Sequence, residues 1–320
     1  MATVLQTDYA WPEDGVERTI IEAAGHRLVS GPSTAVTPEA IETLVAEHDP
    51  QAIMTCWAQV SARAINAAKD LRIVQRFGVG LDNIDVTAAT NRGAWVANVP
   101  DYCVEEVSDH AIALMLDWAR GIVACDRDVK EGRWNPAATR LWRVSDLTVG
   151  IIGYGRIGKR TAQKLRGFGC RILIHSRSIP ADPVGEVLPL DDLLRASDVT
   201  IIQAPYTPET HHMIDAVRFA TMRRGSFLIN VSRGALVDTN ALLVALETGQ
   251  LSGAGLDVVE GEPNPPRALV TRPDVIVTPH VAFSSDGSLA ELRRRAAEEV
   301  VRVLAGERPH NPCNSVEQAS

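Results

Sequence analysis

Cysteine is scarce in this sequence and forms no recognisable pattern. The five cysteines contain no C-x-x-C pair and are scattered along the chain, at Cys56, Cys103, Cys125, Cys170 and Cys313. A disulfide framework or a metal site needs regularly spaced ligands, so we expect reduced thiols, no bound metal and a cytoplasmic protein. The N-terminus shows no basic stretch followed by an apolar one, and no apolar run reaches the roughly 18 residues of a membrane helix.

Positive charge is also in deficit. The chain has 32 Lys and Arg against 40 Asp and Glu, which gives a formal net charge of -8. A nucleic-acid or anionic-membrane surface needs clustered positive charge, so neither partner is expected. A small anionic substrate remains compatible, because it needs only one or two local arginines.

The size and pattern of the chain predict two α/β domains. A chain of 320 residues exceeds what one core normally supports. Short apolar runs alternate with helical patterns, which is typical of parallel sheets covered on both faces. We therefore predict two doubly wound parallel-sheet domains. The expected strands are 2–8, 51–56, 71–78 and 93–100 in the first domain, and 148–152, 172–175, 199–203, 226–231, 254–259 and 275–279 in the second.

Two long helical patterns lie outside this alternation. Residues 103–123 predict one amphipathic helix, with Val107, Ile112, Met115 and Leu116 near one face. The last helix, about 289–304, has no strand after it, so we expect it to return to the first domain. The predicted domains are 1–100 with 286–320, and 101–285 inserted between them.

A glycine pattern assigns a dinucleotide to the inserted domain. Gly153, Gly155 and Gly158 have the G-x-G-x-x-G spacing and stand between an apolar strand and a helix. The first glycine permits a tight turn, the second lets a pyrophosphate approach the backbone, and the third lets helix and strand pack closely. We expect Tyr154, Arg156 and Ile157 to contact the cofactor with them.

The acid that normally follows the second strand of such a domain is missing. Ser176 occupies the expected position and Arg177 follows it. An aspartate would bind the ribose 2′-OH, whereas serine and arginine suit a 2′-phosphate. The pattern predicts a preference for NADP(H), with NAD(H) as the alternative.

Polar residues follow three of the later strands. Arg233 comes after strand 226–231, Asp257 and then Glu262 after the next, and His280 after 275–279. Ligands of open α/β sheets bind outside the carboxyl ends of the strands. We therefore expect these four side chains to share one cleft.

At this point the chain resembles the D-isomer-specific 2-hydroxyacid dehydrogenase family. The resemblance rests on RFGVGLDNIDV, NVPDYCVEEVSDHAIALML, VGIIGYGRIGKR, NVSRGALVD, GAGLDVVEGEP and TPHVAF, in family order. Within the family, several of these segments look most like the C-terminal-binding-protein branch. The resemblance implies an oxidoreductase that reduces a small 2-oxo acid to a D-2-hydroxy acid.

The resemblance also implies roles for individual residues. His280 is the expected general acid, with Glu262 as the carboxylate that stabilises its protonated form. Arg233 is expected to bind the substrate carboxylate and polarise its carbonyl. Asp257 would accept a hydrogen bond from the nicotinamide carboxamide. The remaining predicted contacts are Ala204, Pro205, Val231 and Ser232 with the cofactor, and Arg76, Gly78, Val79, Gly80 and Phe283 with the substrate.

Two departures from the family pattern concern the pocket. Gln203-Ala204 stands where many relatives carry Leu-His, and Phe283 stands where the branch typically has tryptophan. Relatives pair through the region of the helix 103–123, so a homodimer is expected. Two alternatives stay open: a dinucleotide-sensing, corepressor-like binding module, and a phosphite-type oxidising dehydrogenase.

Overall fold

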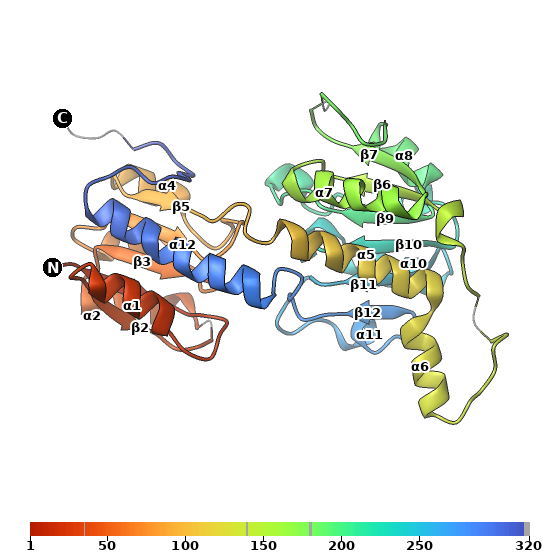
Figure 1. The fold of residues 1–320 in the computed structure, drawn as a ribbon, viewed down its shortest axis with the longest axis horizontal. Coiled ribbons are helices and arrows are strands. Elements are labelled where there is room, and N and C mark those ends of the chain that lie inside the picture. The colour runs from red at the N-terminus through yellow and green to blue at the C-terminus, as the bar shows by residue number, and fades with distance from the viewer. Residues whose placement is uncertain (35, 139, 179–180, 317–320) are drawn as a thin grey trace. The chain divides into compact units, whose positions relative to one another are not determined.

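The computed structural model describes residues 1–34, 36–138, 140–178 and 181–316. The chain forms two compact units, and each is described by itself. Unit 1 comprises Met1–Tyr102 and Ser285–Ser320, and unit 2 comprises Cys103–Ser284. Each unit contains one parallel sheet with helices on it, so the predicted α/β fold class is confirmed (Figure 1).

Unit 1 has a five-stranded sheet in the order β2-β1-β3-β4-β5, which is the flavodoxin-like doubly wound order. Its strands are β1 (Thr3–Gln6), β2 (Arg27–Ser30), β3 (Ala52–Thr55), β4 (Ile73–Arg76) and β5 (Trp95–Ala97). Its helices are α1 (Gly15–Ala23), α2 (Pro38–His48), α3 (Ala62–Ala67), α4 (Val86–Asn91) and α12 (Asp286–Leu304). The sequence analysis missed β2 and α4.

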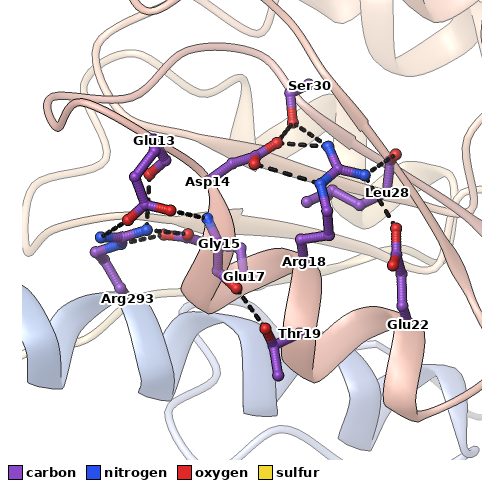
Figure 2. A network of polar contacts seen from close by, with 10 residues as sticks. All are labelled: Glu13, Asp14, Gly15, Glu17, Arg18, Thr19, Glu22, Leu28, Ser30 and Arg293. Carbon is purple, nitrogen blue, oxygen red and sulfur yellow. Dashed lines mark hydrogen bonds and ion pairs between the residues drawn. The ribbon is translucent and has the colours of Figure 1, made fainter.

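The last helix belongs to unit 1 and packs on its first helix (Figure 1). Arg293 of α12 donates from Nε and Nη2 to the two carboxylate oxygens of Glu17 at 2.9 and 2.8 Å (Figure 2). Glu17 is fully buried, and the Arg293 guanidinium also lies 5.2 Å from the centroid of the Trp11 ring. A buried carboxylate requires such a partner, so this pair fixes α12 against α1.

Unit 2 has a seven-stranded sheet in the order β12-β11-β10-β9-β6-β7-β8, in which every strand pair is parallel. Read from β8 to β11, the six strands β8-β7-β6-β9-β10-β11 have the order 3-2-1-4-5-6 that is typical of dinucleotide-binding domains. The strands are β6 (Thr148–Ile152), β7 (Arg171–His175), β8 (Glu186–Val187), β9 (Val199–Ile202), β10 (Ser226–Asn230), β11 (Leu251–Leu256) and β12 (Val275–Val277). The two-residue β8 was not predicted.

Helices cover both faces of this sheet. They are α5 (Val104–Arg120), α6 (Ile122–Lys130), α7 (Arg156–Leu165), α8 (Leu190–Ala196), α9 (Ala216–Thr221), α10 (Thr239–Glu247) and α11 (Arg267–Val270). Helices α5 and α7 pack together, and α8, α9 and α10 contribute to an apolar core with the strands. The described residues of unit 2 also form four short 3-10 helices: Val144–Asp146, Arg166–Phe168, Pro208–Thr210 and Gly234–Leu236.

The predicted helix 103–123 is two helices. Gly121 adopts a left-handed conformation with φ 60°, which ends α5 at Arg120, and α6 then starts in a new direction (Figure 1). Glycine takes this conformation without the steric cost that a side chain would add. Val107, Ile112 and Met115 are buried as expected, whereas Leu116 is only half-buried.

Candidate active site

The predicted site residues of unit 2 follow strands whose carboxyl ends lie at one edge of the sheet. Every strand pair of this sheet is parallel, so the segments after β6, β7, β9, β10, β11 and β12 emerge on the same side. These segments carry the glycine turn, Ser176 and Arg177, Ala204 and Pro205, Val231 to Arg233, Asp257 with Glu262, and His280 with Phe283. This edge is where an open α/β sheet binds its ligand.

The glycine turn joins β6 to α7. Gly153 has φ 100°, and a Cβ on it would lie 2.5 Å from the carbonyl oxygen of Gln203. A Cβ on Gly158 would lie 2.0 Å from the carbonyl oxygen of Gly153. Gly155 differs, because a Cβ there would meet nothing within 4 Å in the described structure. The protein itself thus requires glycine at 153 and 158, whereas the open space over Gly155 fits the close approach of a phosphate group.

Helix α7 offers its free N-terminus at this space. Gly155 is its N-cap, and no side-chain cap is formed there in the part of the chain that the structure describes. The first N–H groups of a helix lack intrahelical partners and carry partial positive charge. The turn therefore fits a dinucleotide pyrophosphate.

The side chain of Tyr154 makes a structural contact outside the glycine turn. Its hydroxyl accepts a hydrogen bond of 2.8 Å from the backbone N–H of Val184, beyond the end of β7. Tyr154 thereby ties the glycine turn to the segment that follows Ser176 and Arg177. Its backbone still lies within the turn predicted to contact the cofactor.

The end of β7 lies directly beside the glycine turn, since the N–H of Gly153 donates to the carbonyl of His175 at 2.8 Å. Ser176 is half-buried and Arg177 is exposed. Hydrogen bonding from Thr207 lowers the pKa of Glu209, and the charge of Arg177 contributes to the same shift. Glu209 is thus an acid near Arg177 that the sequence analysis did not assign to this region.

Gln203 stands where many relatives carry leucine, and its side chain contacts helix α7. Its Nε2 donates to Thr161 Oγ1 of α7 at 2.8 Å, so the side chain joins β9 to α7. The glutamine of this departure from Leu-His therefore makes a contact within unit 2, whereas nothing in the structure explains Ala204. Ala204 and Pro205 follow it at the sheet edge.

Arg233 stands on a turn organised by Asn230. The Asn230 side chain donates to the carbonyl of Arg233 at 2.8 Å and accepts from the N–H of Ser232 at 3.1 Å. The hydroxyl of Ser232 donates to the carbonyl of Ile202 at 3.1 Å. A Cβ on Gly234 would lie 2.2 Å from the backbone of Val259, so only glycine lets this turn pack against the segment leading to Glu262.

The structure brings His280 and Glu262 together, as the sequence analysis expected. Nδ1 of His280 lies 2.9 Å from Oε1 of Glu262, with side-chain exposures of 24% and 40%. The His280 ring also contacts Phe283 edge-on, with centroids 6.3 Å apart. A partly exposed imidazole held by a carboxylate is suited to deliver a proton from its other nitrogen.

Asp257 is almost completely buried, at 2% exposure, and its backbone carbonyl accepts from the N–H of His280 at 2.8 Å. Its carboxylate accepts from the hydroxyl of Thr278 at 2.6 Å and from the N–H groups of Val281 and Ala282 at 2.9 Å each. The predicted hydrogen bond to a carboxamide stays a prediction. In the structure these oxygens hold the segment that carries His280.

Two histidines that the sequence analysis did not assign make polar contacts near this edge. His110 of α5 lies 2.9 Å from Thr278 Oγ1, and His212 lies 2.6 Å from Glu260. Burial acts to raise the pKa of the Glu260 carboxyl. Hydrogen bonds from His212 and Thr239 outweigh this effect, so the pKa of Glu260 is lowered. Neither contact could be predicted from the sequence, because each joins residues that are far apart in the chain.

The predicted substrate residues of unit 1 lie at and beyond the end of β4. Arg76 is 7% exposed, and its Nε has no hydrogen-bond partner among the described residues. A Cβ on Gly78 would lie 3.0 Å from Arg76 Nη1, so glycine leaves room for the guanidinium. Gly78 is buried, Val79 is exposed and Gly80 is half-buried.

Cys56 lies close to this arginine but is poorly suited to react. Burial raises the pKa of the Cys56 thiol to about 12, although the Arg76 charge opposes the shift. The thiol therefore stays protonated at neutral pH and is a poor nucleophile. Among the described residues, no group of three or more His, Cys, Asp or Glu is placed to hold a metal ion, and no helix is long and apolar enough to cross a membrane.

Curated proteins similar to this chain include glyoxylate reductases. The glyoxylate reductase of Pyrococcus horikoshii is 37% identical over 310 residues, which covers 93% of this chain and 92% of that protein. The glyoxylate reductase of Korarchaeum cryptofilum is 40% identical over 264 residues, which covers 80% of each chain.

Solved structures with the same fold cover nearly the whole chain. The TT0316 protein of Thermus thermophilus has a TM-score of 0.89 at 32% identity, over 98% of this chain and 100% of its own. An NADPH-dependent glyoxylate/hydroxypyruvate reductase of Sinorhizobium meliloti, in complex with NADP and malonate, has a TM-score of 0.85 at 30% identity, over 100% and 99%. D-lactate dehydrogenase of Aquifex aeolicus, in complex with NAD and lactic acid, has a TM-score of 0.88 at 27% identity, over 98% and 100%.

A family model matches most of unit 2. Residues 112–282 match the model described as D-isomer specific 2-hydroxyacid dehydrogenase, NAD binding domain. The matched range includes the glycine turn, Arg233, Glu262 and His280. The protein is therefore an oxidoreductase and belongs to the D-isomer specific 2-hydroxyacid dehydrogenase family.

Proposed function

We propose that this protein is an NADPH-dependent reductase of a small 2-oxo acid, which it converts to the D-2-hydroxy acid. The observation that carries the proposal is the 2.9 Å contact between His280 and Glu262, at the same sheet edge as the glycine turn. An imidazole and a carboxylate in contact are suited to proton transfer, and the turn is suited to a dinucleotide. The glyoxylate reductases among the relatives support glyoxylate as a substrate to test first.

The nicotinamide cofactor, when bound, supplies the hydride. The chain's own groups supply the proton and the charge. Nδ1 of His280 is engaged by Glu262, so Nε2 carries the proton to the ketone oxygen. Glu262 stabilises the imidazolium before that transfer.

Arg233 is proposed to bind the oxo acid through its carboxylate and to polarise the carbonyl. A guanidinium is permanently charged and presents several donors in a fixed plane, which matches a carboxylate. The Asn230 contacts described above hold the backbone from which it projects. In unit 1, Arg76 and the segment Gly78 to Gly80 are proposed to contribute further donors for the anion.

The cofactor preference is proposed from Ser176 and Arg177. Neither side chain repels a 2′-phosphate, and Arg177 adds a positive charge. A relative with NADPH in its name, the Sinorhizobium meliloti reductase, supports this choice. The Aquifex aeolicus enzyme binds NAD, so the family accommodates both nucleotides.

A homodimer is proposed through an apolar surface of unit 2. Helix α6 has no buried residue, and the side chains of Ile122, Val123 and Val129 are 60%, 50% and 49% exposed. Trp134 beyond it is 83% exposed. Apolar groups gathered on one projecting segment favour an interface, and most soluble homo-oligomers are twofold symmetric.

The proposed activity is tested by following NADPH oxidation at 340 nm with glyoxylate and hydroxypyruvate. We expect turnover with at least one of them, which His280→Ala lowers roughly a hundred- to ten-thousandfold. Tight NADPH binding without turnover of any oxo acid would instead favour a dinucleotide-sensing module. NADP reduction by phosphite, without oxo-acid turnover, would favour the phosphite-type reaction.

A further inference from the structure

The backbone of His280 has a positive φ, which is uncommon for a residue that carries a side chain. Its φ is 54°, one of three positive φ values among the described non-glycine residues. A side chain other than glycine is uncommon in this left-handed region, and such residues persist only where the surroundings hold them. The question is which groups hold His280 there.

Asp257 accepts hydrogen bonds from His280 and from the two residues that follow it. Its backbone carbonyl accepts from the N–H of His280 at 2.8 Å. Its two carboxylate oxygens accept from Val281 and Ala282, the next two N–H groups, at 2.9 Å each. Three consecutive backbone N–H groups of this turn therefore donate to one buried aspartate. Since two of them donate to its carboxylate, the position of that carboxylate determines the direction of the imidazole.

The carboxylate is in turn fixed by a hydroxyl. Thr278 Oγ1 donates to Asp257 Oδ1 at 2.6 Å, and it lies 2.9 Å from Nε2 of His110. A threonine hydroxyl has one proton, and a carboxylate can only accept. Nε2 of His110 must therefore be the donor to Thr278, which gives one continuous direction: from His110 to Thr278 to Asp257.

We propose that His110 and Thr278 are positioning residues that hold His280, through Asp257, in the geometry needed for proton transfer. The proposal rests on the proposed function, because it assigns His280 the role of general acid. His110 lies on α5, which also packs against β10 and β11. The chain of hydrogen bonds thus ties the His280 turn to the long helix of unit 2.

The kinetic test compares two substitutions at Thr278. Thr278→Val keeps the shape and removes the hydroxyl, whereas Thr278→Ser keeps the hydroxyl. We expect Thr278→Val to lower kcat roughly ten- to hundredfold, since small displacements of a reacting group have effects of that size. The KM for the oxo acid should stay within about twofold, because Arg233, which is proposed to bind the substrate carboxylate, is untouched. Thr278→Ser should restore most of kcat.

The far end of the chain is tested at His110. His110→Gln retains an N–H donor and should preserve kcat better than His110→Leu, which removes it. Thr221→Val is the matched control, since Thr221 on α9 donates only within its own helix, to Val217 at 3.0 Å. It should leave kcat unchanged. Equal losses in Thr278→Val and Thr278→Ser would overturn the proposal, since they would show that the hydroxyl is not what matters.

Amide hydrogen exchange gives a readout that needs no substrate. If Thr278 fixes the carboxylate, the amides of Val281 and Ala282 should exchange at least about tenfold faster in Thr278→Val than in the native protein. Unchanged exchange at these amides would overturn the proposal even if kcat fell. If the native protein turned over no oxo acid, the proposed function would fail, while the exchange result would still decide whether Thr278 and Asp257 hold this turn.

Discussion

The carboxylate of Glu262 contacts the imidazole of His280 at 2.9 Å, although the two residues are 18 positions apart in the chain. Glu262 follows β11 and His280 follows β12, and these strands are adjacent and parallel. The pairing of the two strands therefore makes the contact possible. Most of what the protein is expected to do as an enzyme depends on this pair.

Removing the imidazole should abolish most of the catalysis without weakening cofactor binding. General acid catalysis contributes roughly a hundred- to ten-thousandfold, so His280→Ala should lower kcat by about that factor. The Kd for NADPH, measured by fluorescence titration, should be nearly native. Near-native turnover in this variant would show that another group supplies the proton.

Glu262→Gln should lower kcat without weakening cofactor binding. The variant keeps the size of the side chain but loses the negative charge beside the imidazole of His280. The charged contact is proposed to hold His280 ready for proton transfer, so we expect kcat with the oxo acid to fall roughly tenfold or more. Steady-state kinetics together with the Kd for NADPH tests this, and a native kcat would contradict the role given to Glu262.

Arg233→Ala should impair both kinetic constants. The guanidinium is proposed to bind the ground-state carboxylate and to stabilise the charge that develops on the carbonyl oxygen, so KM should rise and kcat should fall. Arg233→Lys should recover little, because an ammonium lacks the planar pair of donors. A change in KM alone would restrict Arg233 to substrate binding.

Ser176→Asp should reverse the cofactor preference. A carboxylate at this position repels a 2′-phosphate and can accept from a ribose 2′-OH. We expect the native protein to bind NADPH more tightly than NADH, and the variant to do the opposite, in titrations followed by tryptophan fluorescence. Tighter binding of NADH by the native protein would contradict the assignment.

Breaking the buried ion pair of unit 1 should reduce stability. Arg293→Leu leaves the fully buried carboxylate of Glu17 without its partner, which typically costs about 3–5 kcal/mol. Arg294→Leu is the matched control, since the pair of Arg294 with Glu298 is about half exposed on both sides. Urea unfolding should show a large loss for the first variant and a change within about 0.5 kcal/mol for the second.

The sequence predicted the elements with the clearest patterns and missed those without one. Strands β6 and β10 each contain a run of apolar residues and were placed within a residue. Strand β8 has only Glu186 and Val187 and relies on its pairing with β7. The end of α5 was missed because Gly121 interrupts an apolar pattern that continues into α6. A hydrophobic pattern alone does not reveal one residue with a left-handed backbone conformation, such as Gly121.

The candidate site divides in the same way. Glu262, His280 and the glycine turn lie in motifs that follow strands, so their placement at one edge of the sheet could be expected from the sequence. The direction of the Gln203 side chain toward Thr161, and the contact of His110 with Thr278, depend on packing between segments distant in sequence. No motif encodes such contacts, and they appear only once the helices are placed on the sheet.

The split of unit 1 between the two ends of the chain has a consequence for how the protein is made. Helix α12 begins at Asp286, after the whole of unit 2 has been synthesised. On the ribosome, unit 2 is therefore the first part that can reach its native packing, because domains fold as units once their residues are available. Helix α1 is translated early, but its Glu17 can form the buried ion pair only after Arg293 of α12 has been synthesised. The N-terminal part of unit 1 is therefore translated first and completes its packing last.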